Sequence, residues 1–182
     1  RQYILTAFGL MGLATSCNDF GDVNNDPMNL NPGVVDYKME FTQVEAQICG
    51  SDWDVWRNGC IYTANMIQHT ASVDWAYGVF YTWNDQYSGA YWGGFYSGGR
   101  AAIRNIIDVM NNWEGNPAYA NEYQMCRILK AYMFQNMTDL YGDVPYSEAG
   151  QGYSTNPIPY PKYDTQEAIY NDLLKELDEA QA

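Results

Sequence analysis

The sequence has few of the residues and motifs on which catalysis and metal binding most often depend. It contains one histidine, His69, and its four cysteines include no Cys-x-x-Cys pair, so neither a zinc site nor a redox motif is indicated. The Gly-x-Ser-x-Gly, His-Glu-x-x-His and phosphate-loop motifs are absent as well. We therefore expect no metal site, no cofactor, no catalytic residue and no enzymatic activity, and we assign His69 a structural role.

Positive charge is also scarce. The 182 residues include 9 Lys plus Arg against 22 Asp plus Glu, which gives a formal net charge of -13 at pH 7. Binding to nucleic acid and adsorption to anionic lipid both need clustered cations. The charge therefore argues against either partner.

The apolar run at the beginning of the chain is too short to cross a bilayer. It follows Arg1 and extends from Tyr3 to Leu13, whereas a spanning helix needs about 20 apolar residues. Small residues then precede a cysteine, in the order Ala14-Thr15-Ser16-Cys17, as in the signal of a bacterial lipoprotein. We predict a signal peptide over 1–16, lipidation of Cys17, a polar tether over 17–33 and a helical domain over 34–182.

Aromatic residues, by contrast, are abundant, with 17 Tyr, 6 Trp and 6 Phe. They concentrate in residues 72–99, where they alternate with glycines, amides and carboxylates. Rings that carry a polar tip suit a half-exposed surface, on which sugar rings can stack. The candidate ligand-binding residues are Trp75, Tyr77, Tyr81, Trp83 and Asn84. The alternative, which the sequence leaves open, is that these rings cover a junction between helices.

The rest of the chain has a helical pattern. Apolar residues at spacings of three and four predict helices over 34–48, 52–70, 91–113 and 118–140, and another after residue 164. The apolar stripe expected in the second helix is Trp53, Trp56, Cys60, Ala64 and Ile67. The stripe expected in the fourth helix is Tyr123, Ile128, Leu129, Tyr132, Met133, Met137 and Leu140. Asp164 and Glu167 fit a capping box at the start of the last helix.

The three remaining cysteines fall within these predicted helices. We expect Cys49, Cys60 and Cys126 to be buried free thiols. A disulfide between Cys49 and Cys60 is left open.

The fourth helix ends at Tyr141-Gly142-Asp143-Val144-Pro145-Tyr146. Gly142 can adopt the left-handed conformation that ends a helix, and Pro145 removes a backbone donor. We expect the Asp143 side chain to hydrogen-bond within its own turn. Tyr141, Gly142, Asp143 and Pro145 are interpreted as a structural corner that does not contact a ligand. The corner would direct the last helix so that Leu173, Leu174 and Leu177 pack back.

Two stretches resemble the SusD/RagB family. They are Leu129-Lys130-Ala131-Tyr132 and residues 138–149, TDLYGDVPYSEA, followed by a Pro-rich loop and the last predicted helix. The resemblance implies an all-α architecture with tetratricopeptide-like helical pairs, of which this chain would be the truncated N-terminal portion. One departure is Lys130, where the family commonly has arginine, so a forked donor is lost.

The resemblance also implies a function. The family consists of outer-membrane, cell-surface lipoproteins that bind glycans or other nutrients and hand them to a SusC-like TonB-dependent transporter. A helical protein–protein scaffold without a small ligand is the alternative. A carboxylate-based glycoside hydrolase is a further alternative, because Asp139, Asp143 and Glu148 cluster near the corner, although turn and cap roles suit these acids better.

Overall fold

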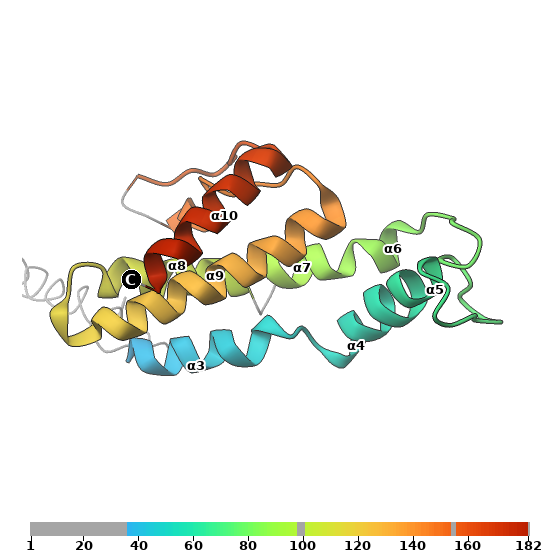
Figure 1. Ribbon diagram of the computed structural model, residues 1–182, viewed down its shortest axis with the longest axis horizontal. Coiled ribbons are helices and arrows are strands. Elements are labelled where there is room, and N and C mark those ends of the chain that lie inside the picture. Colours follow the sequence, from blue (N-terminus) through green and yellow to red (C-terminus); the bar gives the residue numbers. More distant parts are fainter. Residues whose placement is uncertain (1–35, 98–100, 154–155, 182) are drawn as a thin grey trace, which may run out of the picture. The chain divides into compact units, whose positions relative to one another are not determined.

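The computed structural model describes residues 36–97, 101–153 and 156–181, and contacts within the chain separate residues 1–36 from residues 37–182. The second unit consists of helices, and the only β contact among its described residues is an isolated bridge between Val144 and Asp164 (Figure 1). The predicted all-α fold is confirmed. The proposed signal peptide, Cys17 and the tether lie outside the described residues.

The elements follow one another along the chain in a simple order. The helices of at least seven residues are α3 (Tyr37–Ile48), the π-helix η1 (Val55–Thr63), α7 (Ala90–Tyr96), α8 (Ala102–Trp113), α9 (Ala120–Tyr141) and α10 (Gln166–Ala180). Short helical turns lie between them: α4 (Asp52–Asp54), α5 (Ala64–Met66), α6 (Asp85–Ser88), η2 (Pro117–Tyr119) and η3 (Gln151–Tyr153).

Helix α9 is the element around which the unit is packed. It contacts α3 and α8 on one side and α10 on another. Arg127 of α9 pairs with α10 through a fork, with Nε 2.6 Å from Glu176 and an Nη atom 2.5 Å from Glu179. Lys130 also approaches Glu176, with its Nζ atom at 3.9 Å, but a lysine ammonium cannot form a fork of the kind that Arg127 makes.

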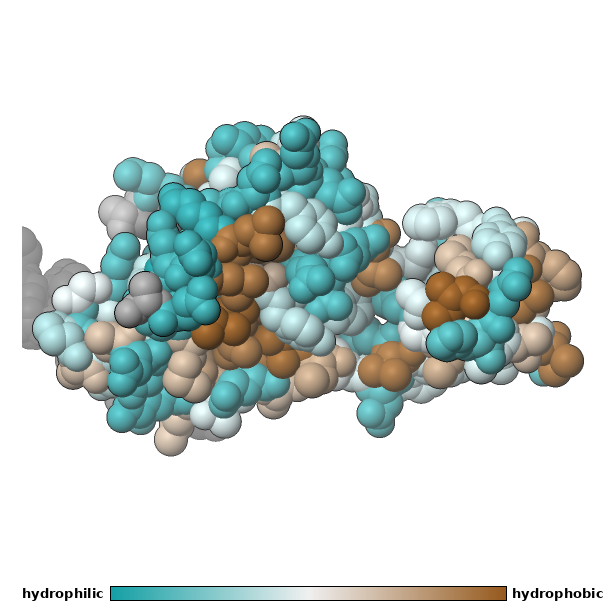
Figure 2. Space-filling model, viewed as in Figure 1, coloured by the Kyte–Doolittle hydropathy of each residue, from teal (hydrophilic) through white to brown (hydrophobic). Residues whose placement is uncertain are grey.

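A groove between α9 and α10 stays open to solvent. Figure 2 shows hydrophobic residues gathered where the two helices meet. Those with large exposed fractions are Ile128, Tyr132, Leu174 and Leu177. Leu173 is buried, but Leu174 and Leu177 are not, so the expectation that all three pack back is wrong for two of them.

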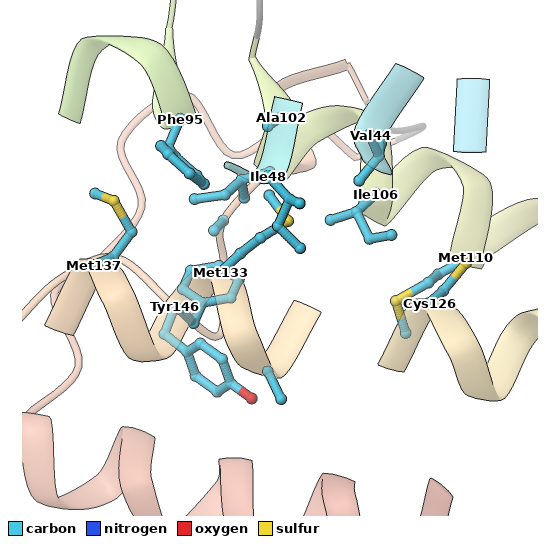
Figure 3. Packing of buried hydrophobic residues seen from close by; sticks show 14 of the residues in the cluster. Val44, Ile48, Phe95, Ala102, Ile106, Met110, Cys126, Met133, Met137 and Tyr146 are labelled. Atoms are coloured by element: carbon cyan, nitrogen blue, oxygen red, sulfur yellow. The ribbon is translucent and has the colours of Figure 1, made fainter. Parts of the chain in front are cut away.

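The core lies where α3, α7, α8 and α9 meet (Figure 3). Residues that are essentially inaccessible there include Val44, Phe95, Ile106, Met133 and Met137. Most are aliphatic, sulfur-containing or aromatic side chains, which close-pack without polar atoms to satisfy. The hydrophobic burial at this junction is the main force that holds the short helices together.

The apolar stripe predicted for α9 is partly wrong. Met133 and Met137 are fully buried, whereas Ile128, Tyr132 and Leu140 are 44%, 48% and 37% exposed. Cys126, Ala131 and Phe134, which the stripe omitted, are buried instead. Because α9 packs against α3, α8 and α10, its buried face is broad, and it includes the polar residue Thr138, which an apolar stripe omits.

The second predicted helix differs most from its sequence pattern. It runs as α4, η1 and α5 and ends at Met66, and it begins with a capping box formed by Ser51 and Asp54, with Asp52 following the cap. Nine residues of it are π-helical. Its buried face carries three polar residues, Asp54, Asn58 and Asn65, which a stripe chosen from apolar residues does not indicate. Trp53, Cys60 and Ile67 are exposed, and the buried positions are Asp54, Asn58, Ile61, Tyr62 and Asn65.

The helix predicted over 91–113 is interrupted. Helix α7 ends at Tyr96 and α8 begins at Ala102. Ala101 before it has φ 37° and ψ 48°, a left-handed conformation that a continuous α-helix does not contain.

The cysteine prediction holds for one residue of three. Cys126 is buried, and its burial raises the pKa of the thiol to about 12. Cys49 and Cys60 are exposed, and both are free, so they form no bridge.

The corner after α9 is tied down by backbone and side-chain hydrogen bonds. Gly142 ends the helix with φ 75° and ψ -121°, and Thr138 donates a 2.7 Å hydrogen bond to its carbonyl oxygen. Val144 and Asp164 exchange two backbone hydrogen bonds of 3.2 and 3.0 Å. The corner and the start of α10 are thus joined directly.

The predictions for Asp143 and Asp164 are both wrong, because each residue hydrogen-bonds to the segment that was expected for the other. Asp164 does not cap α10; its carboxylate accepts from the backbone N–H groups of Tyr146 and Ser147, at 3.3 and 2.7 Å. Thr165 is the N-cap and accepts from Ala168. Asp143 does not bond within its own turn but accepts a 2.9 Å hydrogen bond from the backbone of Gln166, in the first turn of α10.

Candidate functional site

A pocket lies at the junction of α6 and α7, next to the end of α9. Its volume is about 350 Å³. Four of its eight lining residues carry aromatic rings and two are carboxylates; the lining consists of Trp83, Asp85, Ser88, Gly89, Trp92, Tyr141, Asp143 and Tyr163. Aromatic walls with a few placed polar groups are typical of small-molecule sites.

Tyr141 joins the end of α9 to the α6–α7 junction. Its hydroxyl donates a 2.6 Å hydrogen bond to the carbonyl oxygen of Ser88 and accepts a 3.1 Å hydrogen bond from the backbone N–H of Trp92. Burial raises the pKa of this hydroxyl, against the opposing effect of the Trp92 bond, so it keeps its proton and remains a donor. One phenol of the pocket lining therefore holds the end of α9 against the α6–α7 junction.

Trp92 is the ring around which the pocket is arranged. Its ring centroid lies 5.4 Å from that of Tyr141, in an edge-to-face arrangement, and 6.1 Å from that of Tyr163, nearly parallel at 19°. Both separations fall in the range preferred by aromatic pairs. Tyr163 comes from the segment before α10, so the pocket combines residues from distant parts of the chain.

Trp83 and Asp85 form the outer rim. Trp83 is 70% exposed, and its indole N–H donates to the Asp85 carboxylate. Asn84 between them caps α6, with its side-chain oxygen accepting from the backbone N–H of Tyr87 at 3.2 Å. The cap fixes the direction in which the two flanking side chains leave the backbone.

A second group of rings lies on the π-helix side of α6. Trp56 makes edge-to-face contacts with Trp53, Trp75 and Tyr87, at centroid distances of 5.4, 5.3 and 5.8 Å. The chain between residues 72 and 84 reaches this group through Gly78, where an added Cβ would lie 2.4 Å from the carbonyl oxygen of Ile61. Only glycine permits that approach.

Similarity to known proteins identifies the family of this chain. Residues 34–182 match the model of a SusD-like family, described as starch-binding and associating with the outer membrane. The chain belongs to the SusD-like family.

Two solved structures similar to this SusD-like chain support the assignment. One, named a chitin-binding protein, is 34% identical with a TM-score of 0.65, and the match covers 79% of this chain and 29% of that chain. The other, named Bacteroidetes AC2a SusD-like, is 30% identical with a TM-score of 0.64, and the match covers 80% of this chain and 26% of that one. This chain thus spans under a third of either. No match was found among the curated proteins.

The SusD-like chain does not gather the five predicted ligand-binding residues in one place. Trp83 lines the pocket and Asn84 supports it, whereas Trp75 and Tyr77 contact the second group of rings. Tyr81 lines a separate cavity of about 480 Å³ beside His69. Trp75 and Tyr81 have φ values of 51° and 53°, which are costly for aromatic residues.

The pocket includes residues that the sequence does not predict to contact a ligand. Tyr141 and Asp143, interpreted as a corner apart from any ligand, line it, and Trp92, Tyr163 and Asp85 were not candidates. Only the general aromatic richness of residues 72–99 pointed to Trp92. Tyr163 carried no signal, because its proximity to Trp92 depends on how α10 returns to α9.

Each of the three acids that suggested a hydrolase accepts a hydrogen bond from a residue of the fold. Asp139 accepts from the Tyr170 hydroxyl, Asp143 from the Gln166 backbone, and Glu148 from the Lys162 backbone at 2.9 Å. Within the described ranges, no group of three or more His, Cys, Asp or Glu residues could hold a metal ion. Among the same residues, no helix is long and apolar enough to cross a membrane.

Proposed function

We propose that this protein is a lipid-anchored, surface-facing component of the outer membrane, which captures a glycan or another nutrient and passes it to a SusC-like TonB-dependent transporter. It binds its ligand without chemical conversion. The observation that carries the binding step is the pocket formed by Trp83, Trp92 and Tyr163, with carboxylates at its rim. Family membership supports a glycan as the ligand, since the family description is starch-binding.

The pocket suits a sugar for a physical reason. The faces of sugar rings carry C–H groups that stack on aromatic rings, while their hydroxyls hydrogen-bond to carboxylates and amides. Trp83 offers an exposed face, and Asp85 and Asp143 offer acceptor oxygens nearby. The name of one similar structure, a chitin-binding protein, adds chitin oligosaccharides to starch oligosaccharides as ligands to test.

The test is titration calorimetry with starch and chitin oligosaccharides on the wild type and on Trp83→Ala. Removing an aromatic anchor should weaken binding at least about tenfold. Trp53→Ala is the matched control, because Trp53 is also exposed, at 62%, and lies outside the pocket. Loss of affinity in Trp75→Ala but not in Trp83→Ala would move the site to the second group of rings.

Delivery to a transporter has its own test. The expected result is that a TonB-dependent transporter, encoded in an adjoining reading frame, co-purifies with this protein from outer membranes. Purification of the protein free of any such transporter contradicts the delivery step.

A helical protein–protein scaffold without a small ligand is a second candidate. The open apolar groove between α9 and α10, lined by Ile128, Tyr132, Leu174 and Leu177, favours it. Absence of binding across the whole glycan panel would support the scaffold over the proposed function.

A further inference from the structure

The pocket at the α6–α7 junction has a charge of one sign. Asp85 and Asp143 are both exposed carboxylates that line it, and none of its eight lining residues is basic. Each carboxylate uses Oδ1 for a structural hydrogen bond, Asp85 to the indole N–H of Trp83 and Asp143 to the backbone N–H of Gln166. The second oxygen of each has no hydrogen-bond partner among the described residues and remains available to a ligand.

The surroundings reinforce this charge. The chain has a net charge of -13, so the long-range field attracts cations and repels anions. The aromatic faces of Trp83, Trp92 and Tyr163 act in the same direction, because a ring face attracts a positive charge. A neutral sugar would use the rings and leave the free carboxylate oxygens with only hydroxyl donors.

We infer that the pocket prefers glycans that carry protonated amino groups, of which partly deacetylated chitin is the accessible example, over neutral and acidic glycans. The inference rests on the proposed function and names the ligand class of the same site. An ammonium group supplies charge-assisted hydrogen bonds to the free carboxylate oxygens and a cation to the ring faces. A uronate would place a third carboxylate beside those of Asp85 and Asp143, and the like charges would repel one another.

The experiment compares three oligosaccharides of equal length by titration calorimetry: glucosamine oligomers, N-acetylglucosamine oligomers and galacturonate oligomers. Mildly acidic buffer keeps the amines protonated. Glucosamine oligomers should bind about three- to tenfold tighter than N-acetylglucosamine oligomers, the range expected for one or two exposed ion pairs. Galacturonate oligomers should bind most weakly. The preference should shrink as added salt screens the charges.

Two conservative variants locate the effect. Asp85→Asn and Asp143→Asn keep a side-chain oxygen for the structural hydrogen bonds and remove the charge. Each should reduce affinity for glucosamine oligomers about threefold more than it reduces affinity for N-acetylglucosamine oligomers. Asp178→Asn on exposed α10 is the control, because it makes the same change in net charge outside the pocket.

The outcomes separate the inference from the proposed function. Equal affinity of the wild type for glucosamine and N-acetylglucosamine oligomers overturns the inference and leaves glycan binding standing. An equal loss in Asp178→Asn overturns it as well, because the preference would then reflect net charge alone. Absence of binding to every sugar, starch oligosaccharides included, overturns both. The salt dependence of the wild type decides the question even if a variant fails to fold.

Discussion

At the residue scale, Gly142 has the most restrictive position in the corner after α9. Its φ of 75° and ψ of -121° lie in a region that side chains with a Cβ avoid, although a Cβ there would meet no atom within 4 Å. The expected cost of Gly142→Ala is therefore backbone strain alone, about 1–2 kcal/mol in the free energy of unfolding. Urea denaturation measures it.

The control for Gly142→Ala is a glycine with the same free space and ordinary dihedrals. Gly93, inside α7, also has no atom within 4 Å of an added Cβ. Gly93→Ala should be stabilising by about 0.5–1 kcal/mol, because alanine favours a helix interior. If both variants shift stability in the same direction, backbone strain at Gly142 is not the cause.

Asp164 makes the stability of the same corner depend on pH. Burial raises the pKa of its carboxyl, but hydrogen bonds from Ser147 and Tyr146 outweigh burial and hold the pKa below its usual value. Because the folded-state pKa is lowered, the carboxylate contributes stability above the unfolded-state pKa of about 3.9 and loses it as the pH falls through the folded value.

Asp164→Ala tests this contribution. At pH 7 the variant should lose about 1–2 kcal/mol of unfolding free energy, the cost of two unmet backbone donors. The difference from the wild type should shrink below about pH 4. Asp178→Ala, in which an exposed acid of α10 is removed, should change stability by less than about 0.5 kcal/mol at either pH. If the difference in unfolding free energy between the wild type and Asp164→Ala does not change with pH, the charge of the Asp164 carboxylate does not stabilise the corner.

The roles of Asp143, Asp164 and Thr165 could not be predicted from the local sequence. Both Asp and Thr are good N-cap residues, and they stand side by side before α10. The bridge between Val144 and Asp164 decides which one caps, because it turns the Asp164 side chain towards Tyr146 and Ser147. That bridge is not visible in a local pattern.

At the scale of elements, Leu173 is one of the buried residues through which α10 packs against the rest of the unit. Leu173 is 4% exposed, whereas its neighbour Leu174 is 64% exposed. Leu173→Ala should cost about 2–5 kcal/mol in unfolding free energy, since it removes a packed side chain and leaves a cavity. Leu174→Ala should cost less than about 0.5 kcal/mol.

Leu174→Ala is the control for Leu173→Ala, because both variants replace a leucine of α10 and the two positions differ in burial. Thermal and urea unfolding of the full chain give both values. Comparable losses in the two variants would mean that the groove at Leu174 is covered in solution, which would favour the scaffold function.

The elements were predictable to different degrees for physical reasons. The existence and approximate limits of α3 and α9 follow from the spacing of their apolar residues, as does the end of α8, but the start of α8 does not. The π-helix over Val55–Thr63 changes the hydrogen-bonding pattern within the predicted helix, and polar Asn58 is buried there while Cys60 is exposed. No residue in that stretch marks the change.

At the scale of the whole molecule, the candidate site depends on contacts between distant parts of the chain. Trp92 meets Tyr163 only because α10 returns to α9 after the corner. Tyr141 then joins the end of α9 to α6 through its hydrogen bond to Ser88. The aromatic-rich segment contains Trp83, which lines the pocket, but its composition could not distinguish rings that line a pocket from rings that pack on the π-helix. Both environments favour the same residue types.

The proposed anchor is the last feature that belongs to this scale. An acidic chain of net charge -13 is repelled by anionic lipid, so stable residence at a membrane requires a covalent attachment or an apolar one. Cys17, which follows the apolar run and small residues, is the proposed attachment point.

Cys17→Ala, expressed from the complete gene in a Gram-negative host, should lose incorporation of labelled fatty acid and leave the membrane fraction. Cys49→Ala and Cys60→Ala should keep both properties, although each removes an exposed thiol. Retention of the label in Cys17→Ala would place the lipid on another residue and remove the basis for the tether over 17–33.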